Sequence, residues 1–248
     1  MRLFLHQLRT EQLVFWRSRE AAFFIFVFPL LLFLLLGSVY DGTIYGVPAP
    51  QALLAGLIGY GCANTAFAGL AISLVVRREL GILKRLRATP LTSSAYVASA
   101  LVSTLAVFLV QVVVLFLIGR LMYDTPFPRA FVSLLVALLF GAAVFAALGV
   151  ATASLIRSSE GASAVVNIVL LPMAFLTGSF GPTRHYPAVL RAFGDGLPLK
   201  YLIDLLNAIY LHNHAIWSKP LALAVLAAWG VAGLAVATLK FRWEPTPS

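Results

Sequence analysis

Charged residues are scarce in this sequence. Asp, Glu, Lys and Arg together make up only 11% of the chain, whereas 61% of the residues are hydrophobic and the mean hydropathy is +0.95. Soluble domains contain about 25% charged residues and about 45–50% apolar residues. A water-soluble chain of 248 residues could not bury this much apolar surface. We therefore expect the protein to use a lipid bilayer as part of its solvent.

Three further absences exclude or disfavour particular kinds of site and activity. A single cysteine, Cys62, excludes a disulfide framework and a cysteine-based zinc site. The phosphate-binding pattern G-x-x-x-x-G-K-[ST] is missing and no glycine is followed by lysine, which excludes ATP hydrolysis by the P-loop route in this chain. The first five apolar runs contain no ionisable side chain away from their ends, which argues against a proton-coupled carrier and against a channel with a charged filter.

Long apolar runs are what the sequence does contain. A hydrocarbon core about 30 Å thick requires roughly 20 apolar residues of helix, and six stretches meet this requirement. They are continuous rather than alternating, which excludes a β-barrel. We predict an all-α membrane protein with six transmembrane helices in one transmembrane domain, 1–248. The predicted spans are 21–40, 52–76, 95–122, 130–156, 162–181 and 220–239, and the first is expected to be permanent because no A-x-A-like cleavage site follows it.

The distribution of Lys and Arg predicts the orientation. Twelve cations fall on one side of the predicted spans and six on the other, while the loop 41–51 carries none. The larger group comprises Arg2, Arg9, Arg17, Arg19, Arg77, Arg78, Lys84, Arg85, Arg87, Arg157, Lys240 and Arg242. By the positive-inside rule, both termini are cytoplasmic. Because long apolar runs separate these cations, the net charge of +9 reflects topology and does not indicate a nucleic-acid surface.

Residues 1–20 precede the first span and have an amphipathic pattern. Phe4, Leu8 and Phe15 share one face of a helix, and basic side chains share the opposite face. This pattern predicts an interfacial helix that lies on the inner membrane surface, with its cations near anionic lipid. A solvated basic tail is the alternative.

The segment 77–90 predicts a short amphipathic helix in a cytoplasmic loop. Leu80, Leu83 and Leu86 recur every three residues, cations surround them, and Thr89-Pro90 ends the helix because the residue before proline is disfavoured in the α conformation. Such an apolar stripe needs a partner. An ordinary basic anchoring loop would explain the charges but not the ordered leucines.

The segment 182–215 is interrupted by Pro182, Pro187 and Pro198, yet it is too apolar for a free loop. Irregular backbone at membrane depth requires protein or water to satisfy its polar groups. We predict short re-entrant or extracellular helices between the fifth and sixth spans, with a loop packed on the outside of the bundle as the alternative.

The chain resembles the ABC-2 type permeases, the membrane subunits of bacterial ATP-driven exporters. The resemblance is carried by Arg77–Leu91 (RRELGILKRLRATPL) and by Pro172–Pro182 (PMAFLTGSFGP), which continues to Leu197–Asp204 (LPLKYLID). It extends over the whole chain and is strongest to the drug and antibiotic exporter branch. Ser179–Pro182 departs from the family pattern, in which bulkier residues stand between the glycine and the proline, so the shape of the outer gate stays open.

The resemblance implies partners. Two permease subunits would pair with two nucleotide-binding ATPase subunits on the cytoplasmic side of a bacterial inner membrane. ATP and Mg²⁺ would bind to the ATPase, and this chain would bind no cofactor or metal. A second copy of this chain is the expected partner permease, with a related chain as the alternative. The segment 77–90 would be the coupling helix and 1–20 would brace it. The implied ATPase contacts are Glu79, Gly81, Leu83 and Leu86, with Arg85 and Arg87 at the rim.

Polar residues within the predicted spans are candidates for a substrate path, although interhelical hydrogen bonding is the simpler interpretation. They are Asn64, Gln111 and Asn167. Aromatic residues along spans without a charged pocket favour export of a hydrophobic or amphipathic cargo, such as a drug, an antibiotic or a lipid-like molecule. Export of a polysaccharide or lipid-linked glycan is the alternative. The predicted outer gate comprises Pro172, Phe180 and Pro182.

Two classes outside this family are disfavoured. A secondary carrier should show paired broken helices at mid-membrane, and the sequence has one broken region only. A membrane hydrolase should show a convergent polar cluster, but Asp195 and Asp204 are separated by Pro198 and are expected to cap helices or pair with nearby cations. His212 and His214 lack a carboxylate partner nearby in sequence and are interpreted as surface residues rather than metal ligands.

Overall fold

The computed structural model describes residues 2–87 and 92–241, and this part of the chain is almost entirely helical. The first half contains α1 (Arg2–Arg17), α2 (Arg19–Ala22), the π-helical segment η1 (Phe23–Val27), α3 (Phe28–Val39), α4 (Ala49–Cys62), the π-helical segment η2 (Ala63–Gly69), α5 (Leu70–Glu79) and α6 (Ile82–Arg87). The second half contains α7 (Ser93–Tyr123), α8 (Phe131–Leu155), α9 (Ala162–Leu176), α10 (Ala188–Asp195), α11 (Pro198–Tyr210), the short 3₁₀ helix η3 (Ile216–Ser218) and α12 (Pro220–Lys240). The two-residue strands β1 (Thr43–Ile44) and β2 (Val47–Pro48) form a small antiparallel hairpin.

Five helical stretches are long and apolar enough to cross a membrane: Arg19–Val39, Ala49–Glu79, Ala95–Tyr123, Phe131–Leu155 and Pro220–Lys240. They correspond to the first four predicted spans and the sixth. The predicted fifth span, 162–181, is shorter than expected, because α9 has only 15 residues. At 1.5 Å per residue it is about 22 Å long, less than the roughly 30 Å of a hydrocarbon core. It ends early because Gly178 adopts a left-handed conformation with φ of 87°, which stops the helix.

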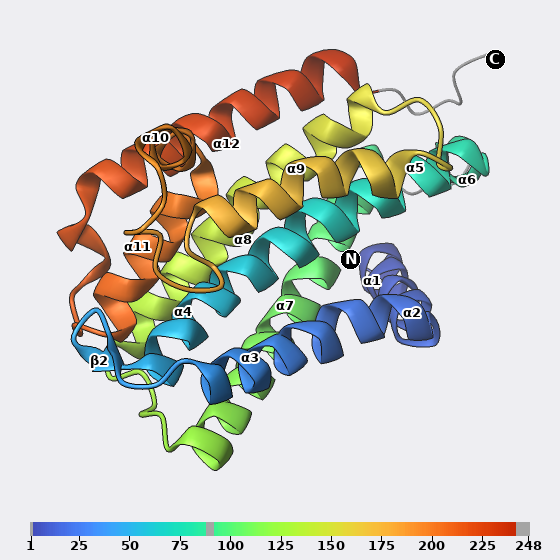
Figure 1. Cartoon of the computed structure of the whole chain (residues 1–248). Helices are drawn as coiled ribbons and strands as arrows, with labels where there is room; N and C mark the ends of the chain where they lie inside the picture. The colour runs from blue at the N-terminus through green and yellow to red at the C-terminus, as the bar shows by residue number, and fades with distance from the viewer. Residues whose placement is uncertain (1, 88–91, 242–248) are drawn as a thin grey trace.

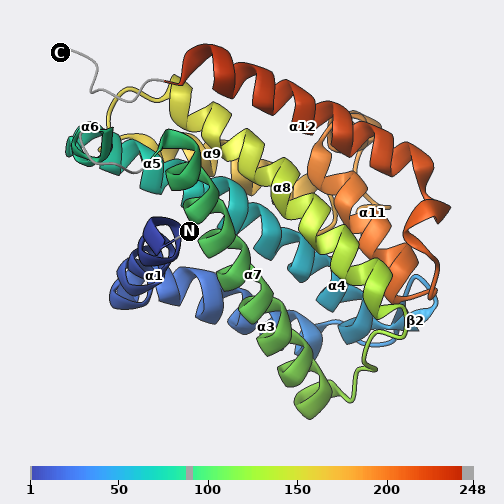
Figure 2. The ribbon, with the colours of Figure 1, turned by 180° about the vertical axis from the view of Figure 1, so that it is seen from behind.

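The long helices and α9 run side by side as one bundle with two distinct ends, whereas α1 and α10 cross the direction of the bundle (Figures 1 and 2). The start of α1, the last turn of α12 and α6 lie at one end, which we call the α6 end. The β hairpin and α10 lie at the other end, the α10 end. Helix α9 runs between the same two ends as the five longer stretches, although it is shorter than they are.

The α4–η2–α5 stretch lies at the centre of the bundle. In its most apolar 18-residue window 78% of the residues are buried, against 11% for Arg19–Val39. It contacts α3, α7, α8, α9 and α11. The second predicted span is therefore the internal support on which α3, α7, α8, α9 and α11 pack.

The segment 182–215 contains a well-packed helix rather than a free loop. Helix α11 contacts α4, α8 and α12, and it approaches glycines on two of them. A Cβ added at Gly59 would lie 2.7 Å from Ile203 Cγ1, and one added at Gly141 would lie 2.7 Å from Leu202 Cδ1. Both distances are shorter than an ordinary van der Waals contact, so glycine at these positions allows α11 to insert between α4 and α8.

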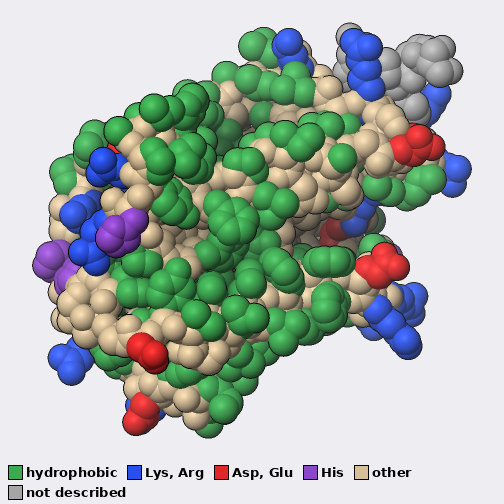
Figure 3. Space-filling model, in the orientation of Figure 1, with side chains coloured by type: hydrophobic (Ala, Val, Ile, Leu, Met, Phe, Trp, Pro, Cys, Tyr) green, Lys and Arg blue, Asp and Glu red, His purple; other side chains and the backbone are tan. Residues whose placement is uncertain are grey.

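Charged and apolar side chains occupy different parts of the surface along the bundle. On the face shown in Figure 3, Lys, Arg, Asp, Glu and His side chains gather toward the two ends, and hydrophobic side chains occupy most of the region between them. The large exposed apolar side chains of this band include Phe24, Leu31 and Leu35 near α3, and Ile168 and Phe175 on α9. A band of this kind is stable in contact with lipid or with another membrane protein rather than with water.

Candidate functional site

Three consecutive side chains at the end of α5 connect it to other elements. Arg77 Nη1 lies 2.6 Å from Glu11 Oε1 of α1 and donates to the hydroxyl of Tyr96 on α7 at 2.9 Å. Gln7 Nε2 donates to the same carboxylate oxygen of Glu11 at 2.8 Å. Both members of the Arg77–Glu11 pair are largely buried, with 16% and 7% of their side chains exposed. The pair therefore fastens α1 to the end of the central span.

Arg78 connects α5 to the end of α8. Its side chain is buried, and its guanidinium donates to the backbone carbonyls of Ala153, at 3.0 Å, and Ile156. The last carbonyls of a helix have no partner within that helix, so a cation in this position satisfies them and interacts favourably with the helix dipole.

Glu79 connects α5 to the segment that leads into α9. Its carboxylate accepts a hydrogen bond from the backbone N–H of Ser159. Together Arg77, Arg78 and Glu79, which we call the α5 hub, link the central span to α1, α7, the end of α8 and the segment before α9. The sequence motif that carries the family resemblance is thus also the structural junction of the α6 end.

The chain turns sharply directly after the hub. Gly81 has φ of 68°, a conformation that glycine adopts without the Cβ clash of other residues, and α6 starts anew at Ile82. The expectation that Leu80, Leu83 and Leu86 share one continuous helical face is therefore wrong, because the turn at Gly81 separates Leu80 from the helix. Leu83 is fully buried, whereas Leu80 is 61% exposed.

The outer surface of this turn has exposed apolar side chains with basic side chains close to them in the sequence. Ile82 is 37% exposed and lies next to Leu80, while Lys84 and Arg85 are exposed. Glu79 is exposed at the base of the turn. The side chains of Leu86 and Arg87 and the predicted stop at Thr89-Pro90 lie outside what the structure describes.

The N-terminal helix packs on the bundle through the face that the sequence predicted to be apolar. Phe4, Leu8 and Phe15 are partly buried, and α1 lies against α7. Gln12 Nε2 donates to both the carbonyl and the hydroxyl of Ser103 on α7, at 3.0 and 2.9 Å. The apolar residues left outside, Leu3, Leu5, Leu13, Val14 and Trp16, are each about half exposed. Helix α1 therefore has an anchored side and a separate apolar outer side.

A row of aromatic rings crosses the face between α3 and α9. Phe24 and Phe28 lie 6.4 Å apart, Phe28 and Tyr60 6.3 Å, Tyr60 and Phe180 5.2 Å, and Phe180 and Phe175 4.9 Å between ring centroids. These separations are typical of interacting aromatic pairs. The aromatic row therefore links the first span to α9 through Phe180, one of the three predicted gate residues.

The other two predicted gate residues lie eight residues before and two residues after Phe180 in the chain. Pro172 is inside α9 and exposed, and Pro182 is partly buried at the end of the turn after α9. This turn packs closely on α4, since a Cβ added at Gly56 would lie 2.6 Å from the carbonyl oxygen of Ser179. The predicted gate therefore rests on the central span.

The three candidate path residues do not converge. Asn64 Nδ2 donates to the carbonyl oxygen of Phe24 at 3.3 Å and so bridges the two π-helical segments. Asn167 is exposed on α9 and donates within its own helix to Ser163. Gln111 is buried on α7, where its Oε1 accepts from Thr65 at 3.2 Å. Since α9 packs on η2, Asn64 and Asn167 belong to neighbouring elements, whereas Gln111 lies between η2 and α7.

Several polar residues of the α10 end pair with groups close to them in the sequence. Asp204 pairs with Lys200 at 3.0 Å, and Tyr201 donates to the carbonyl oxygen of Asp195. The rings of His212 and His214 lie 6.0 Å apart. Among residues 2–87 and 92–241 no group of three or more His, Cys, Asp or Glu side chains could hold a metal ion.

The hub was missed by the sequence analysis, which assigned Glu79 to a partner and treated the two arginines as topology signals. One signal was available: Glu11 is the only acidic residue among the first 19, and it falls on the same helical face as Phe4 and Leu8. An acid on the apolar side of a basic helix indicates a buried cation opposite it.

Replacement of Glu11 by alanine is expected to release α1 from the bundle. The change leaves Arg77 without its carboxylate in a largely buried position, and breaking such a pair costs about 3 kcal/mol, or roughly a hundredfold in the population of the open state. Hydrogen–deuterium exchange of the α1 amides should therefore accelerate by about that factor. Glu20→Ala, which removes an exposed acid from the same region, is the control; equal exchange rates in the two variants would contradict the anchoring role.

The long apolar helices and the charged junction at one end define a multi-pass membrane protein with a short exposed helix outside the bundle. The chain belongs to the ABC-2 type transporter family, whose sequence model matches residues 2–211, as the resemblance predicted. It is 29% identical over 132 residues to the Bacillus subtilis protein named "Putative transport permease YvfS", covering 52% of this chain and 53% of that protein.

Two further relatives carry similar names. "Probable multidrug ABC transporter permease YbhR" of Escherichia coli is 24% identical over 161 residues, covering 64% of this chain and 44% of the relative. "Putative transport permease ycf38" of Cyanophora paradoxa is 31% identical over 169 residues, covering 63% of this chain and 56% of the relative. The alignments thus span about half the length of these relatives.

Proposed function

We propose that this chain is the permease subunit of an ATP-driven exporter in a bacterial inner membrane, with its termini and the α6 end in the cytoplasm. The observation that carries the proposal is the α5–α6 turn. It presents an apolar pair, Leu80 and Ile82, at the outside of the bundle, and it is joined by the hub to four other elements. No P-loop pattern occurs in residues 1–248, which supports a proposed ATPase that lies outside this sequence.

The turn has the composition of a small docking site. Protein interfaces have an apolar centre and a polar rim. Leu80 and Ile82 would form the centre, and Lys84 and Arg85 the rim, with Gly81 giving the turn its shape. Leu86 and Arg87 remain proposed contacts. Leu83, buried in the bundle, would hold α6 in place rather than touch the ATPase.

The hub supplies the mechanical connection. A displacement of α6 by ATP-driven closure of the ATPase would reach α5 directly through the turn at Gly81. From α5 it would pass to α1 and α7 through Arg77, to α8 through Arg78 and to the start of α9 through Glu79. Helices that move together in this way could open a path on one side of the bundle.

The face between α3 and α9 is the proposed side of the path and of the second permease copy. Residues 19–39 have the least buried apolar window of the five long stretches, so this surface is available to another chain. Asn64, Asn167 and the aromatic row contribute to it, and Phe180 with Pro172 and Pro182 would close its outer part. Gln111 would not line the path itself but would hold η2 in place through its hydrogen bond with Thr65. The aromatic and aliphatic character favours a hydrophobic or amphipathic cargo, such as a drug, an antibiotic or a lipid-like molecule.

The experiment is isolation of the tagged full chain from native membranes in a mild detergent, followed by measurement of ATPase activity and of the masses of the complex. We expect a P-loop ATPase to co-purify with two permease chains. Vesicles made from the same membranes should then accumulate an amphipathic dye only when ATP is supplied. Transport by the chain alone without ATP would replace the proposal by a secondary carrier, and ATP-dependent movement of glycans instead of the dye would favour the polysaccharide alternative.

A further inference from the structure

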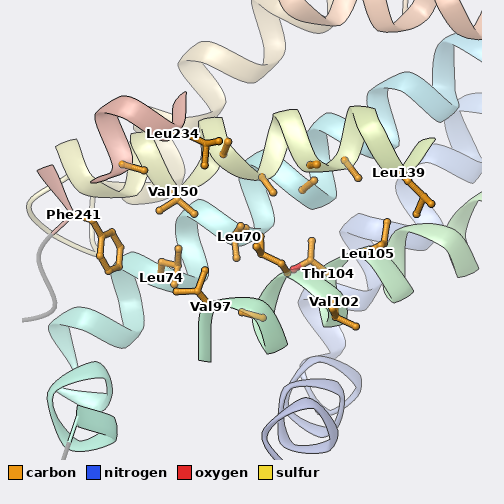
Figure 4. Close-up of a pocket in the computed structure, with 18 of the residues that line it drawn as sticks. Leu70, Leu74, Val97, Val102, Thr104, Leu105, Leu139, Val150, Leu234 and Phe241 are labelled. Atoms are coloured by element: carbon orange, nitrogen blue, oxygen red, sulfur yellow. The ribbon is translucent and has the colours of Figure 1, made fainter. Parts of the chain in front are cut away.

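A second surface of the bundle, away from the α3–α9 face, contains a deep apolar groove. It has a volume of about 570 Å³ and lies between α7 on one side and the α8–α12 pair on the other, with α5 and η2 as its floor (Figure 4). Alanine, leucine, valine and phenylalanine side chains form its walls, and the polar side chains among the lining residues are Thr104 and Thr238. Volumes of this size are typical of ligand sites.

The groove is open to the surface of the bundle and is as long as one leaflet is thick. Val102, Leu139 and Leu234 line it and are 42%, 37% and 56% exposed. Leu139 and Val150 mark its two ends along α8 and are separated by about 16 Å at 1.5 Å per residue. One leaflet of a 30 Å hydrocarbon core is roughly 15 Å thick.

The end of the groove nearest to α6 leads to a basic cavity. This second cavity of about 680 Å³ is lined by Arg78, Arg157 and Lys240, among other residues, and Phe241 lines both cavities. Arg157 and Lys240 are exposed, and neither forms an ion pair within the described part of the chain. Arg78 is buried and donates to the carbonyl oxygens of Ala153 and Ile156. The cavity is therefore a concentration of positive charge at the end of an apolar groove.

We infer that the groove and the basic cavity together bind one anionic phospholipid of the adjacent leaflet. An acyl chain would occupy the groove between α7 and α8, and the phosphate would lie between Arg157 and Lys240. A phosphate there also provides a counter-charge for Arg78, which reduces the cost of burying its guanidinium. Basic pockets between membrane helices at the cytoplasmic border bind anionic headgroups for this reason.

Charge complementarity selects this occupant over the others that an apolar groove could hold. A helix of a second copy would fill the groove but would provide no negative charge for the three cations at its end. A zwitterionic lipid would fill the groove but carries no net negative charge. The inference does not depend on the proposed export function, since it concerns a surface distinct from the α5–α6 turn and from the α3–α9 face.

Native mass spectrometry of the purified full chain in a non-ionic detergent tests the inference. The probes are phosphatidylglycerol and phosphatidylcholine with identical C16 chains, and inorganic phosphate as a competitor. With about 1 kcal/mol for each of two cations, phosphatidylglycerol should bind roughly thirtyfold more tightly than phosphatidylcholine. Inorganic phosphate should not displace it, because phosphate cannot occupy the groove.

Two sets of variants separate the headgroup from the acyl chain. Arg157→Gln with Lys240→Gln should remove the preference for phosphatidylglycerol, while the control, Arg129→Gln with Lys219→Gln at the α10 end, should retain it. Ala143 is exposed and lines the groove, so Ala143→Phe should fill the groove and weaken both lipids about equally, whereas Ala232→Phe on the exposed side of α12 should not. All six substitutions, in four variants, fall on exposed positions, and thermal unfolding of each variant checks that the fold is kept.

Three results would overturn the inference. The first is equal binding of the two lipids by the unmodified chain. The second is an equal loss in the variants of the α6 end and the α10 end. The third is displacement of phosphatidylglycerol by inorganic phosphate, which would indicate an anion site without an acyl-chain groove.

Discussion

Replacement of Leu80 and Ile82 together by aspartate is expected to abolish recovery of ATPase activity with this chain. The two side chains form the exposed apolar tip of the α5–α6 turn, at 61% and 37% exposure. Two carboxylates buried at the centre of an interface, each costing several kcal/mol to desolvate, would exceed what a contact of this size contributes. The measurement is ATPase activity in the detergent-purified complex, expected to fall to the background of an untagged preparation.

The matched control is Val189→Asp with Leu190→Asp on α10, because these residues are also adjacent and are 66% and 41% exposed at the opposite end of the bundle. Recovery of the ATPase should be unchanged in this variant. If both double variants retained the ATPase, the α5–α6 turn would not be the docking site. Leu83→Asp is not a suitable test, since a charge placed at this buried position would disturb α6 itself.

Substitution of Gly149 by alanine is expected to destabilise the bundle more than any other single added methyl group on α8. A Cβ at this position would lie 2.8 Å from the carbonyl oxygen of Phe67 and 3.0 Å from that of Ala66. Both atoms belong to the backbone of η2, so no side-chain rotation can relieve the contact, and α8 must move away from the central span. Overpacking of this kind costs about 2 kcal/mol, or roughly 4–8 °C in melting temperature for a chain of this size.

Thermal unfolding in detergent measures the effect, and Gly69→Ala is the control. Gly69 lies in η2 itself, but a Cβ there would approach no atom closer than 3.5 Å. Its melting temperature should be unchanged or slightly raised, because alanine is preferred to glycine in helices. A loss of stability in the Gly69 variant equal to that in the Gly149 variant would assign the effect to helix composition rather than to the close contact between η2 and α8.

The membrane-spanning architecture was predictable because it depends on the length of apolar runs, which is a local property of the sequence. The start of α8 at Phe131 and of α12 at Pro220 lies within a residue of the expected boundary for the same reason. The short α9 was not predictable in this way. The apolar run continues to Gly181, and only the left-handed turn at Gly178 ends the helix at Leu176.

The candidate site was predictable as a segment but not as a set of contacts. The charged motif after the second span pointed to the α5–α6 turn. Whether a given leucine there faces outward depends on the direction that the chain takes at Gly81. Leu80 and Leu83 were expected on one apolar stripe, but Leu80 is exposed and Leu83 is buried. The partners of the hub were not predictable at all, since Arg77 meets an acid 66 positions earlier and Arg78 meets carbonyls 75 and 78 positions later.

The arrangement of the α5 hub has a consequence for the kind of motion that it can pass on. Consecutive residues of an α-helix point about 100° apart around the axis, so Arg77, Arg78 and Glu79 leave α5 in three different directions. Their contacts lie all around the helix and not along one side of it. A sideways translation of α5 would shorten one of these contacts and lengthen another. A rotation of α5 about its own axis would displace all three side chains in the same rotational direction. We therefore expect the central span to transmit a rotation about its own axis more readily than a translation.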